Sequence, residues 1–393
     1  MSNLQQTLVA AAPEALGDLS LPGARDERWR YSSLRALNQR SFSAAPTQPG
    51  ALSPELEAKI AAFPSRLVFV DGHYDEARSA VPGGLAMTTQ IAPANAPAHL
   101  PFARAASALP TLVIGVQQTQ SEPLHIVSVL TAAAADTIVQ QALWIELAAG
   151  TTLSVQHRRI VEADSNVVTN AWRDLALADG ARLDWLEVGE DGERASVVLG
   201  TRARVGAGAT FQFAEVAAGA ALYRHDLDVT LVGEQAVFGV RGCTMVSRRR
   251  HADIHIDARH RAKHTRADIV WRGLADQRGH GIFAGQLIVE AGADGADAAL
   301  SNKNLLLSPH AEIDTRPVLE IHADEVKAAH GATVGRLDER SLFYLRSRGI
   351  PEAEARRILQ LAFAREPLLQ ITDPQLREAA LAALARCLPE DAA

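Results

Sequence analysis

The chain has 393 residues, of which 47% are hydrophobic and 22% charged, and this composition is that of a globular protein with enough length for two or three packing units. Its net charge of −7 argues against a nucleic-acid-binding protein. Two cysteines, Cys243 and Cys387, are too few for a secreted disulfide framework. No signal peptide is apparent, and the most apolar stretch, 109–116, is too short to span a bilayer, so we expect a cytoplasmic protein without a membrane segment.

The first 105 residues predict a mostly helical N-terminal segment. Ser53 followed by Pro54 is typical of a helix start, because the serine caps free N–H groups and the proline lacks one. The run RLVFVDG at 66–72 predicts a strand that ends in an Asp-Gly turn. Residues 91–110 are rich in Pro and Ala, which indicates a connecting segment.

Residues 106–335 predict a core of short strands punctuated by glycine. One phrase recurs there, made of a glycine turn, a small residue and an alternating strand, and its marker glycines lie 30, 28 and 25 residues apart. These are Gly150, Gly180, Gly208 and Gly233. The repeats lack helix-length patterns and the leucine-rich consensus, which excludes the common helical and leucine-rich arrays. A parallel β-helix remains, in which each coil pairs with the coils above and below it.

Residues 336–393 predict a C-terminal helical domain. Asp338 begins one helix and Gly349 ends it as a left-handed cap. Pro351 and Asp373 mark the starts of two more helices. The expected fold is therefore mainly β, with a parallel β-helix flanked by N-terminal and C-terminal α-helical segments.

Sequence motifs for common enzymes are missing from the chain. None of the four lysines follows a glycine, so there is no phosphate-binding loop. The G-x-S-x-G and H-E-x-x-H motifs are also absent. The stretch GHGIFAG at 279–285 has its third glycine one residue too late for a dinucleotide-binding motif. The chain therefore shows no local signature of a hydrolase, a kinase or a zinc protease.

A polar cluster follows the fourth repeat. His251, Asp253, His255 and Asp257 alternate with apolar residues, so a strand would place all four on one face. Imidazoles and carboxylates are metal ligands, which makes a metal site one interpretation. The other, which alternation alone favours, is a half-exposed strand with a solvated outer face.

A second candidate is His330 in the sequence AHGATVG. The small neighbours Ala329 and Gly331 leave its ring open to a metal, a ligand or a partner protein. Lys327 would place a cation nearby and favour the neutral imidazole that binds metals. The alternative is an exposed turn in which the histidine has no partner.

Two other residue types have simple structural interpretations. Cys243 lies among Val, Thr and Met and is expected in the core, as is Cys387 on a helix of Ala and Leu. Trp29 and Tyr31 are expected to hold the N-terminal segment against the core.

Several stretches together resemble a known family. Residues 319–359, beginning LEIHADEVKAAHGATVG, are similar to the C-terminal signature of the SufB/SufD family of iron–sulfur cluster assembly proteins. Residues 304–321 and the histidine-bearing strand at 251–264 are similar to the same family. The stretch RDERWRYSSLRAL at 25–37 resembles the SufD branch.

The resemblance implies a fold and a function. The fold would be a right-handed parallel β-helix between helical segments. The protein would be a non-ATPase scaffold that pairs with a SufB-like homologue and carries a SufC-like ABC ATPase on its C-terminal helices. A transient iron–sulfur cluster would form at the interface, with sulfur supplied indirectly by a cysteine desulfurase system. No cofactor is expected on the isolated chain, and flavin binding stays open.

The resemblance also assigns site residues. His330 matches the family histidine and becomes a candidate ligand of a cluster or metal at the interface. The family often has C-S-H-G where this chain has Ala328-Ala329-His330-Gly331, so a thiol is missing here. The ATPase-binding surface would lie on 338–359. Its expected anchors are Phe343, Tyr344, Arg346 and Arg348, since aromatic residues and arginine dominate interface energetics.

Two other functions stay open. Parallel β-helices often act on polysaccharides, and Asp253 and Asp257 would be the acids of such a carbohydrate-active enzyme. The chain would otherwise be a metal-free homodimeric scaffold. Co-purification of an ATPase and a larger homologue would distinguish the Suf-type scaffold from both, and a homodimer of the isolated chain is compatible with it.

Overall fold

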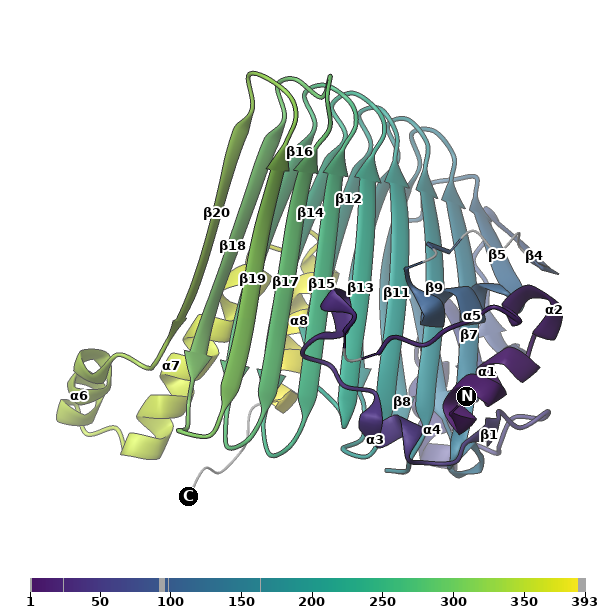
Figure 1. Cartoon of the computed structure of the whole chain (residues 1–393), viewed down its shortest axis with the longest axis horizontal. Helices are drawn as coiled ribbons and strands as arrows, with labels where there is room; N and C mark the ends of the chain where they lie inside the picture. Colours follow the sequence, from purple (N-terminus) through teal and green to yellow (C-terminus); the bar gives the residue numbers. More distant parts are fainter. Residues whose placement is uncertain (1, 24, 92–95, 98, 163, 388–393) are drawn as a thin grey trace.

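The computed structural model describes residues 2–23, 25–91, 96–97, 99–162 and 164–387. It is mostly β, with a solenoid of about seven turns and helices at both chain ends (Figure 1). The expected β-helix between helical segments is therefore confirmed. Within the described residues, no helix is long and apolar enough to cross a membrane.

The elements follow one another as helical turns, a long run of strands and three helices. The N-terminal elements are α1 Asn3–Ala10, α2 Pro13–Leu16, η1 Glu27–Trp29, α3 Arg35–Asn38, β1 Ser43–Ala44, α4 Pro54–Ala61, β2 Arg66–Val70, β3 His73–Ala80, β4 Leu85–Ile91 and α5 Pro101–Ser107. The solenoid elements are β5 Pro110–Val116, β6 Leu124–Leu130, η2 Ala132–Ala134, β7 Thr137–Leu147, β8 Thr152–Val161, β9 Val168–Leu177, β10 Arg182–Glu190, β11 Ser196–Val205, β12 Thr210–Ala217, β13 Leu222–Leu231, β14 Val237–Val246, β15 His251–His260, β16 Arg266–Ala275, β17 His280–Val289, β18 Asp297–Leu306, β19 Glu312–Ile321 and β20 Lys327–Gly335. The C-terminal helices are α6 Glu339–Ser347, α7 Glu352–Leu368 and α8 Pro374–Cys387.

The strands form two sheets that face each other. Sheet A runs β19-β17-β15-β13-β11-β9-β7-β5-β4, and sheet B runs β20-β18-β16-β14-β12-β10-β8-β6-β2-β3. Each coil adds one strand to each sheet, and pairs between successive coils are parallel. Only β2–β3 and β4–β5, at the first coil, are antiparallel.

Inward-facing side chains stack on like side chains because the register is kept from coil to coil. Val240, Ile269 and Leu300 are successive partners in sheet B, and each is at most 4% exposed. Alternate residues point outward, as the pleat of a strand requires. The core is therefore a column of apolar ladders between the sheets.

The recurrent glycine phrase marks the turns of the coils. Gly150, Gly180 and Gly208 all have positive φ, the conformation that glycine adopts without steric cost. The turns also stack, since the N–H of Gly150 donates to Asp179 and that of Gly180 donates to Ala207. The fourth marker, Gly233, differs: Gln235 takes the left-handed conformation there. A Cβ on Gly233 would lie 2.0 Å from the nitrogen of Ala207, so close backbone approach requires this glycine.

The N-terminal segment 1–105 contains strands as well as helices. The predicted helix start is confirmed, since Ser53 caps α4, and the predicted strand is β2. The strands β3 and β4 were not expected, because the mixed polar sequence HYDEARSA has no clean two-residue period. All three strands belong to the two sheets, and the division of the chain at residue 105 stays a prediction.

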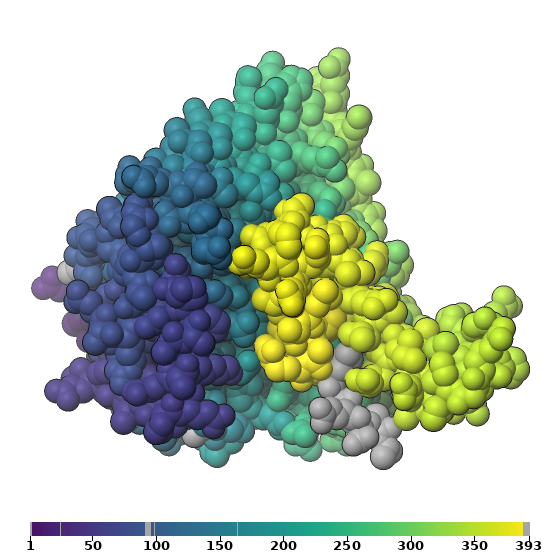
Figure 2. Space-filling view, turned by 180° about the vertical axis from the view of Figure 1, so that it is seen from behind, coloured from purple at the N-terminus to yellow at the C-terminus, as the bar shows by residue number. Residues whose placement is uncertain are grey.

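The two chain ends cover opposite sheets. The N-terminal segment crosses the outer face of sheet A in Figure 1, where Leu4, Leu8 and Trp29 are buried with Val168 and Val198. The helices α7 and α8 lie on the back of sheet B, as Figure 2 shows. Their apolar side chains pack on β10, β12, β14 and β16, and Arg272 of β16 forms a 2.6 Å ion pair with Glu366.

Candidate functional site at the open end of the solenoid

The last coil of the solenoid has a neighbour on one side only. Within the described residues, β19 pairs with β17 alone and β20 with β18 alone. Each strand therefore has one edge with unpaired N–H and C=O groups, which can accept another strand. Ile321 and Val334 on these strands are 42% and 44% exposed. Solenoids need terminal units with polar outer faces for solubility, so an open, partly apolar end is an interaction surface.

His330 lies on this open end. It is the register partner of Leu300 and so continues the inward ladder of Ile269 and Leu300. Because no further coil follows, its ring is exposed instead of buried. The expectation of an unshielded imidazole is confirmed. If another coil followed, its core side chains would pack against this ring.

The alternative interpretation, in which His330 lies in an exposed turn, is wrong, because the residue lies within strand β20. Lys327 is three residues away along this strand, so the two side chains point to opposite faces and their Cα atoms are about 10 Å apart. The expectation that Lys327 places its cation beside the imidazole is therefore wrong.

The chain offers no thiol at the open end. Cys243 is fully buried in the cluster that joins sheet B to α8, as expected, and burial raises the pKa of its thiol well above the usual range. Cys387 is half-buried at the end of α8, and burial raises the pKa of its thiol to about 11. Since a thiolate is the form that binds metals and attacks other groups, the raised pKa values favour a structural role for both thiols.

Helix α6 projects beyond the solenoid, next to the open end (Figures 1 and 2). Asp338 caps it, accepting from the N–H groups of Arg340 and Ser341, and Gly349 ends it with positive φ, both as expected. Phe343 and Tyr344 are 72% and 57% exposed. Large aromatic side chains exposed on a protruding helix are typical of a binding surface.

The two arginines predicted as anchors contact their own chain. Arg346 lies 3.3 Å from the carboxylate of Glu352 on α7, and Arg348 lies over the ring of Tyr344, 5.3 Å from its centre. They therefore brace the corner between α6 and α7 and orient Tyr344. Their contact with an ATPase stays a prediction.

The polar face of strand β15 is covered and not solvated, which corrects that interpretation; the metal-site interpretation stays a prediction. Asp253 is 1% exposed; it accepts hydrogen bonds from Arg224 and from Ser32 of the N-terminal segment. The Nε2 of His255 lies 2.9 Å from the other oxygen of Asp253. Alternation revealed the shared face of these residues but could not reveal that a distant segment covers it.

The N-terminal stretch that resembles the SufD branch makes this cover. Arg28 pairs with Asp226 and Asp257, and the ring of Trp29 stacks on the guanidinium of Arg224 at 4.1 Å. Burial alone would raise the pKa of Asp226, but Arg224 and the other nearby cations hold it at about 2. Asp253 and Asp257 form ion pairs with Arg224 and Arg28 under this cover. These contacts disfavour the interpretation in which the two carboxylates act as catalytic acids on a carbohydrate. Trp29 is buried as expected, while Tyr31 is 41% exposed.

A buried polar cluster between the sheets escaped sequence analysis. The carboxylate of Glu187 on β10 contacts His157 and Arg159 on β8 and Arg173 on β9. Burial lowers the pKa of His157 to about 4 although Glu187 opposes this shift. Burial would raise the pKa of Glu187, but Arg173, His157 and Arg159 hold it well below its usual range. These residues are far apart in the chain, and only the register brings them together.

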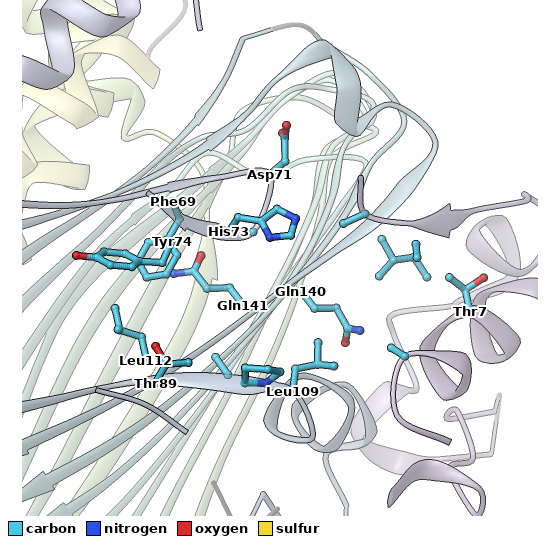
Figure 3. Close-up of a pocket in the computed structure, with 17 residues that line it drawn as sticks. Thr7, Phe69, Asp71, His73, Tyr74, Thr89, Leu109, Leu112, Gln140 and Gln141 are labelled. Carbon is cyan, nitrogen blue, oxygen red and sulfur yellow. The ribbon is translucent and has the colours of Figure 1, made fainter. Parts of the chain in front are cut away.

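A hollow of about 390 Å³ lies near the first coil, beside β2, β3 and β7 (Figure 3). Asp71 accepts hydrogen bonds from Thr131 and from the N–H of Gly50. A ring nitrogen of His73 is 2.7 Å from the carbonyl oxygen of Pro46. Since these polar groups already have partners, the hollow supplies no clear chemistry.

Together these features define a class: a β-solenoid scaffold with one open end, an exposed imidazole on that end and a projecting aromatic helix. A model of the SUF system FeS cluster assembly SufBD core domain matches residues 129–363. The chain belongs to this family and is a SufD-like component of the Suf system of iron–sulfur cluster assembly.

Individual relatives agree with this assignment. The iron–sulfur cluster assembly protein SufD of Escherichia coli is 27% identical over 386 residues, which cover 94% of this chain and 90% of the relative. A SufBD family protein of Synechocystis is 26% identical over 92% of this chain and 86% of its own. A SufBD family protein of Mycobacterium tuberculosis is 29% identical over 54% and 55% of the two chains.

Proposed function

We propose that this chain is the non-ATPase scaffold subunit that pairs with a SufB-like homologue through the open end of its solenoid. It docks a SufC-like ABC ATPase through α6, and the joint between the two solenoids is where a nascent iron–sulfur cluster is assembled. The chain itself catalyses no reaction and holds no resident cofactor. The observation that carries the proposal is the uncapped last coil with His330 exposed on it.

The open end favours another solenoid as its partner. Both terminal strands offer an unpaired backbone edge, and the exposed Ile321 and Val334 supply apolar surface beside these edges. A homologous coil would continue both sheets in the same register and cover these side chains. In that arrangement His330 lies at the joint, shielded from water on both sides.

The division of chemistry follows from the residues present. A cluster needs thiolate or sulfide ligands, and neither cysteine of this chain lies on the last coil. The homologue therefore supplies the sulfur ligands and this chain supplies the imidazole of His330. The ATPase supplies the motion: closure of two nucleotide-bound subunits would shift α6 and the attached solenoids relative to each other.

The test is co-purification of this chain with its co-expressed homologue and ATPase. Val334→Asp places a charge on the apolar rim of the open end, and we expect recovery of the homologue to fall at least tenfold. Val232→Asp is the matched control, because Val232 is equally exposed at 45% but lies in a turn between β13 and β14. The control should recover the homologue as the wild type does.

The contrary result is recovery of the homologue by Val334→Asp at the wild-type level. A wild-type chain that co-purifies only with itself would favour the homodimeric scaffold instead. Circular dichroism of both variants verifies that the comparison is between folded proteins.

A further inference from the structure

Three ionisable side chains on the outer face of sheet A lie close together and have no role in the proposed function. They are His280 of β17 and Glu312 and Asp314 of β19. One ligand atom of each, an imidazole nitrogen or a carboxylate oxygen, lies within 4.8 Å of the others. His330 belongs to the other sheet and points inward, so this cluster is a separate feature.

The backbone register brings these residues together. His280 is the direct partner of Glu312, and Asp314 is the partner of Ile282, two residues further along both strands. Glu312 and Asp314 share the outer face, because Ile313 between them packs against the core. The imidazole is thus beside one carboxylate and diagonal to the next, a geometry set by the sheet itself.

The distances suit a shared metal ion. The Nε2 of His280 is 2.8 Å from a carboxylate oxygen of Asp314. Two ligands bound to one ion at about 2.1 Å lie about 3 Å apart, so these two atoms need almost no movement. Glu312 is exposed and can rotate its carboxylate inward. One imidazole with two carboxylates is a set that first-row divalent metals accept.

Neighbouring residues hold the imidazole in place. His251 is the partner of His280 on the preceding coil, and the two rings meet edge to face with centres 5.0 Å apart. The Nε2 of His251 lies 2.7 Å from the hydroxyl oxygen of Ser32 in the N-terminal segment. Supporting contacts of this kind orient metal ligands and raise affinity.

We propose that His280, Glu312 and Asp314 bind a divalent first-row transition metal ion on the outer face of the last two coils. His280 and Asp314 are 24% and 28% exposed, so water completes the coordination shell. The site lies on the edge strand β19, which is next to the open end (Figure 1). It consists of this chain's residues alone, so metal binding needs no partner and does not depend on the proposed assembly role.

The test is titration of the purified, untagged full chain with Co(II), followed by visible absorption and by calorimetry. We expect one equivalent to bind with a ligand-field spectrum. His280→Ala, Asp314→Asn and Glu312→Gln should each weaken binding at least tenfold. Glu312 is exposed, so we expect Glu312→Gln to fold as the wild type does. Glu320→Gln and His322→Ala are the matched controls. Glu320 lies on β19 like Glu312 and Asp314, but at the other end of the strand, where its carboxylate accepts a hydrogen bond from Gln286. His322 directly follows this strand. Both controls should bind as the wild type does.

Several outcomes would overturn the inference. One is absence of Co(II) binding by the wild type. Another is binding that Glu312→Gln and His280→Ala leave unchanged, which would place the ion elsewhere. A third is tighter binding of Mg(II) than of Co(II), because a site with an imidazole ligand prefers the transition metal.

Discussion

At the scale of single residues, the exposed imidazole of His330 on the last coil stands out by its position in the sheet. It ends a ladder whose earlier members, Ile269 and Leu300, are buried core residues. A histidine at the last position of an apolar ladder is compatible with the fold because no further coil of this chain packs on it. The position is therefore available for contact with another molecule. Our proposal therefore assigns His330 to the joint with the homologue, and we expect its truncation to leave the isolated solenoid folded.

We predict that His330→Ala lowers the yield of iron–sulfur cluster at least fivefold while the complex stays intact. The reason is that the change removes one ligand and leaves the apolar rim and the strand edges in place. Visible absorption after anaerobic reconstitution measures the cluster, and size-exclusion chromatography measures the complex. His310→Ala, a histidine outside β19 and β20, is the control. Full cluster yield in His330→Ala would remove this residue from the mechanism.

The second prediction at the residue scale concerns how the buried His157 makes the stability of the fold depend on pH. Its pKa is about 4 in the folded chain and about 6.5 when unfolded. Between these values the unfolded chain binds a proton that the folded chain does not, so stability falls as the pH drops from 6.5 to 4. This group contributes a slope of up to about 1.4 kcal/mol per pH unit.

Urea unfolding at pH 7, 6 and 5 measures this slope. His157→Gln keeps a polar side chain that does not titrate, so its free energy of unfolding should fall less steeply with decreasing pH than that of the wild type. The slope is compared and not the absolute stability, because the substitution also disturbs the contact with Glu187. Parallel slopes would show that His157 does not cause the acid sensitivity.

At the scale of helices and strands, the sequence predicted the features that depend on neighbouring residues, namely helix ends and glycine turns. Ser53, Asp338 and Gly349 marked helix ends correctly, since caps depend on nearby residues. Three of the four marker glycines occupy left-handed turns. The two-sheet cross-section, the strands β3 and β4 and the cover over β15 were not predictable, because each depends on segments far apart in the chain.

For the candidate sites too, local features were predictable from the sequence, whereas features set by the register of distant strands were not. The exposure of His330 followed from its small neighbours and the family motif, but its strand and facing required the register with Leu300. The sequence did not indicate the cluster of His280 with Glu312 and Asp314, because the histidine lies more than 30 residues from the two carboxylates. Parallel stacking makes such residues direct neighbours, and no local pattern indicates it.

Helix α6 gives the prediction at this scale. Phe343 is 72% exposed, so its truncation should leave the fold intact but remove an anchor from an interface. We expect Phe343→Ala to weaken binding of the SufC-like ATPase by about 2 kcal/mol, or about 30-fold. Leu369→Ala is the control, since Leu369 is 52% exposed at the end of α7. Isothermal titration calorimetry distinguishes them, and equal affinity of both variants would place the ATPase elsewhere.

At the scale of the whole molecule, the two ends of the solenoid are built differently. Near its first coils, sheet A is covered by the N-terminal segment and sheet B by α4, whose Leu56 and Ile60 are buried against β2, β6 and β8. Within the described residues, the sheets end in the antiparallel strands β4 and β3 at the first coil and in the parallel strands β19 and β20 at the last coil. The two ends therefore differ in the direction of their terminal strands, and we expect the last coil, with its parallel edge strands, to be the end that binds a homologous partner.

The central claim is that a homologous solenoid continues the two sheets from β19 and β20, and hydrogen–deuterium exchange tests it most directly. In the isolated chain, every second amide of 312–335 faces the unpaired edge and should exchange rapidly. In the complex with the SufB-like homologue, we predict at least tenfold slower exchange in this region and no change at 196–231, which is already paired on both sides. Unchanged exchange at 312–335, with protection appearing on another face, would contradict the account.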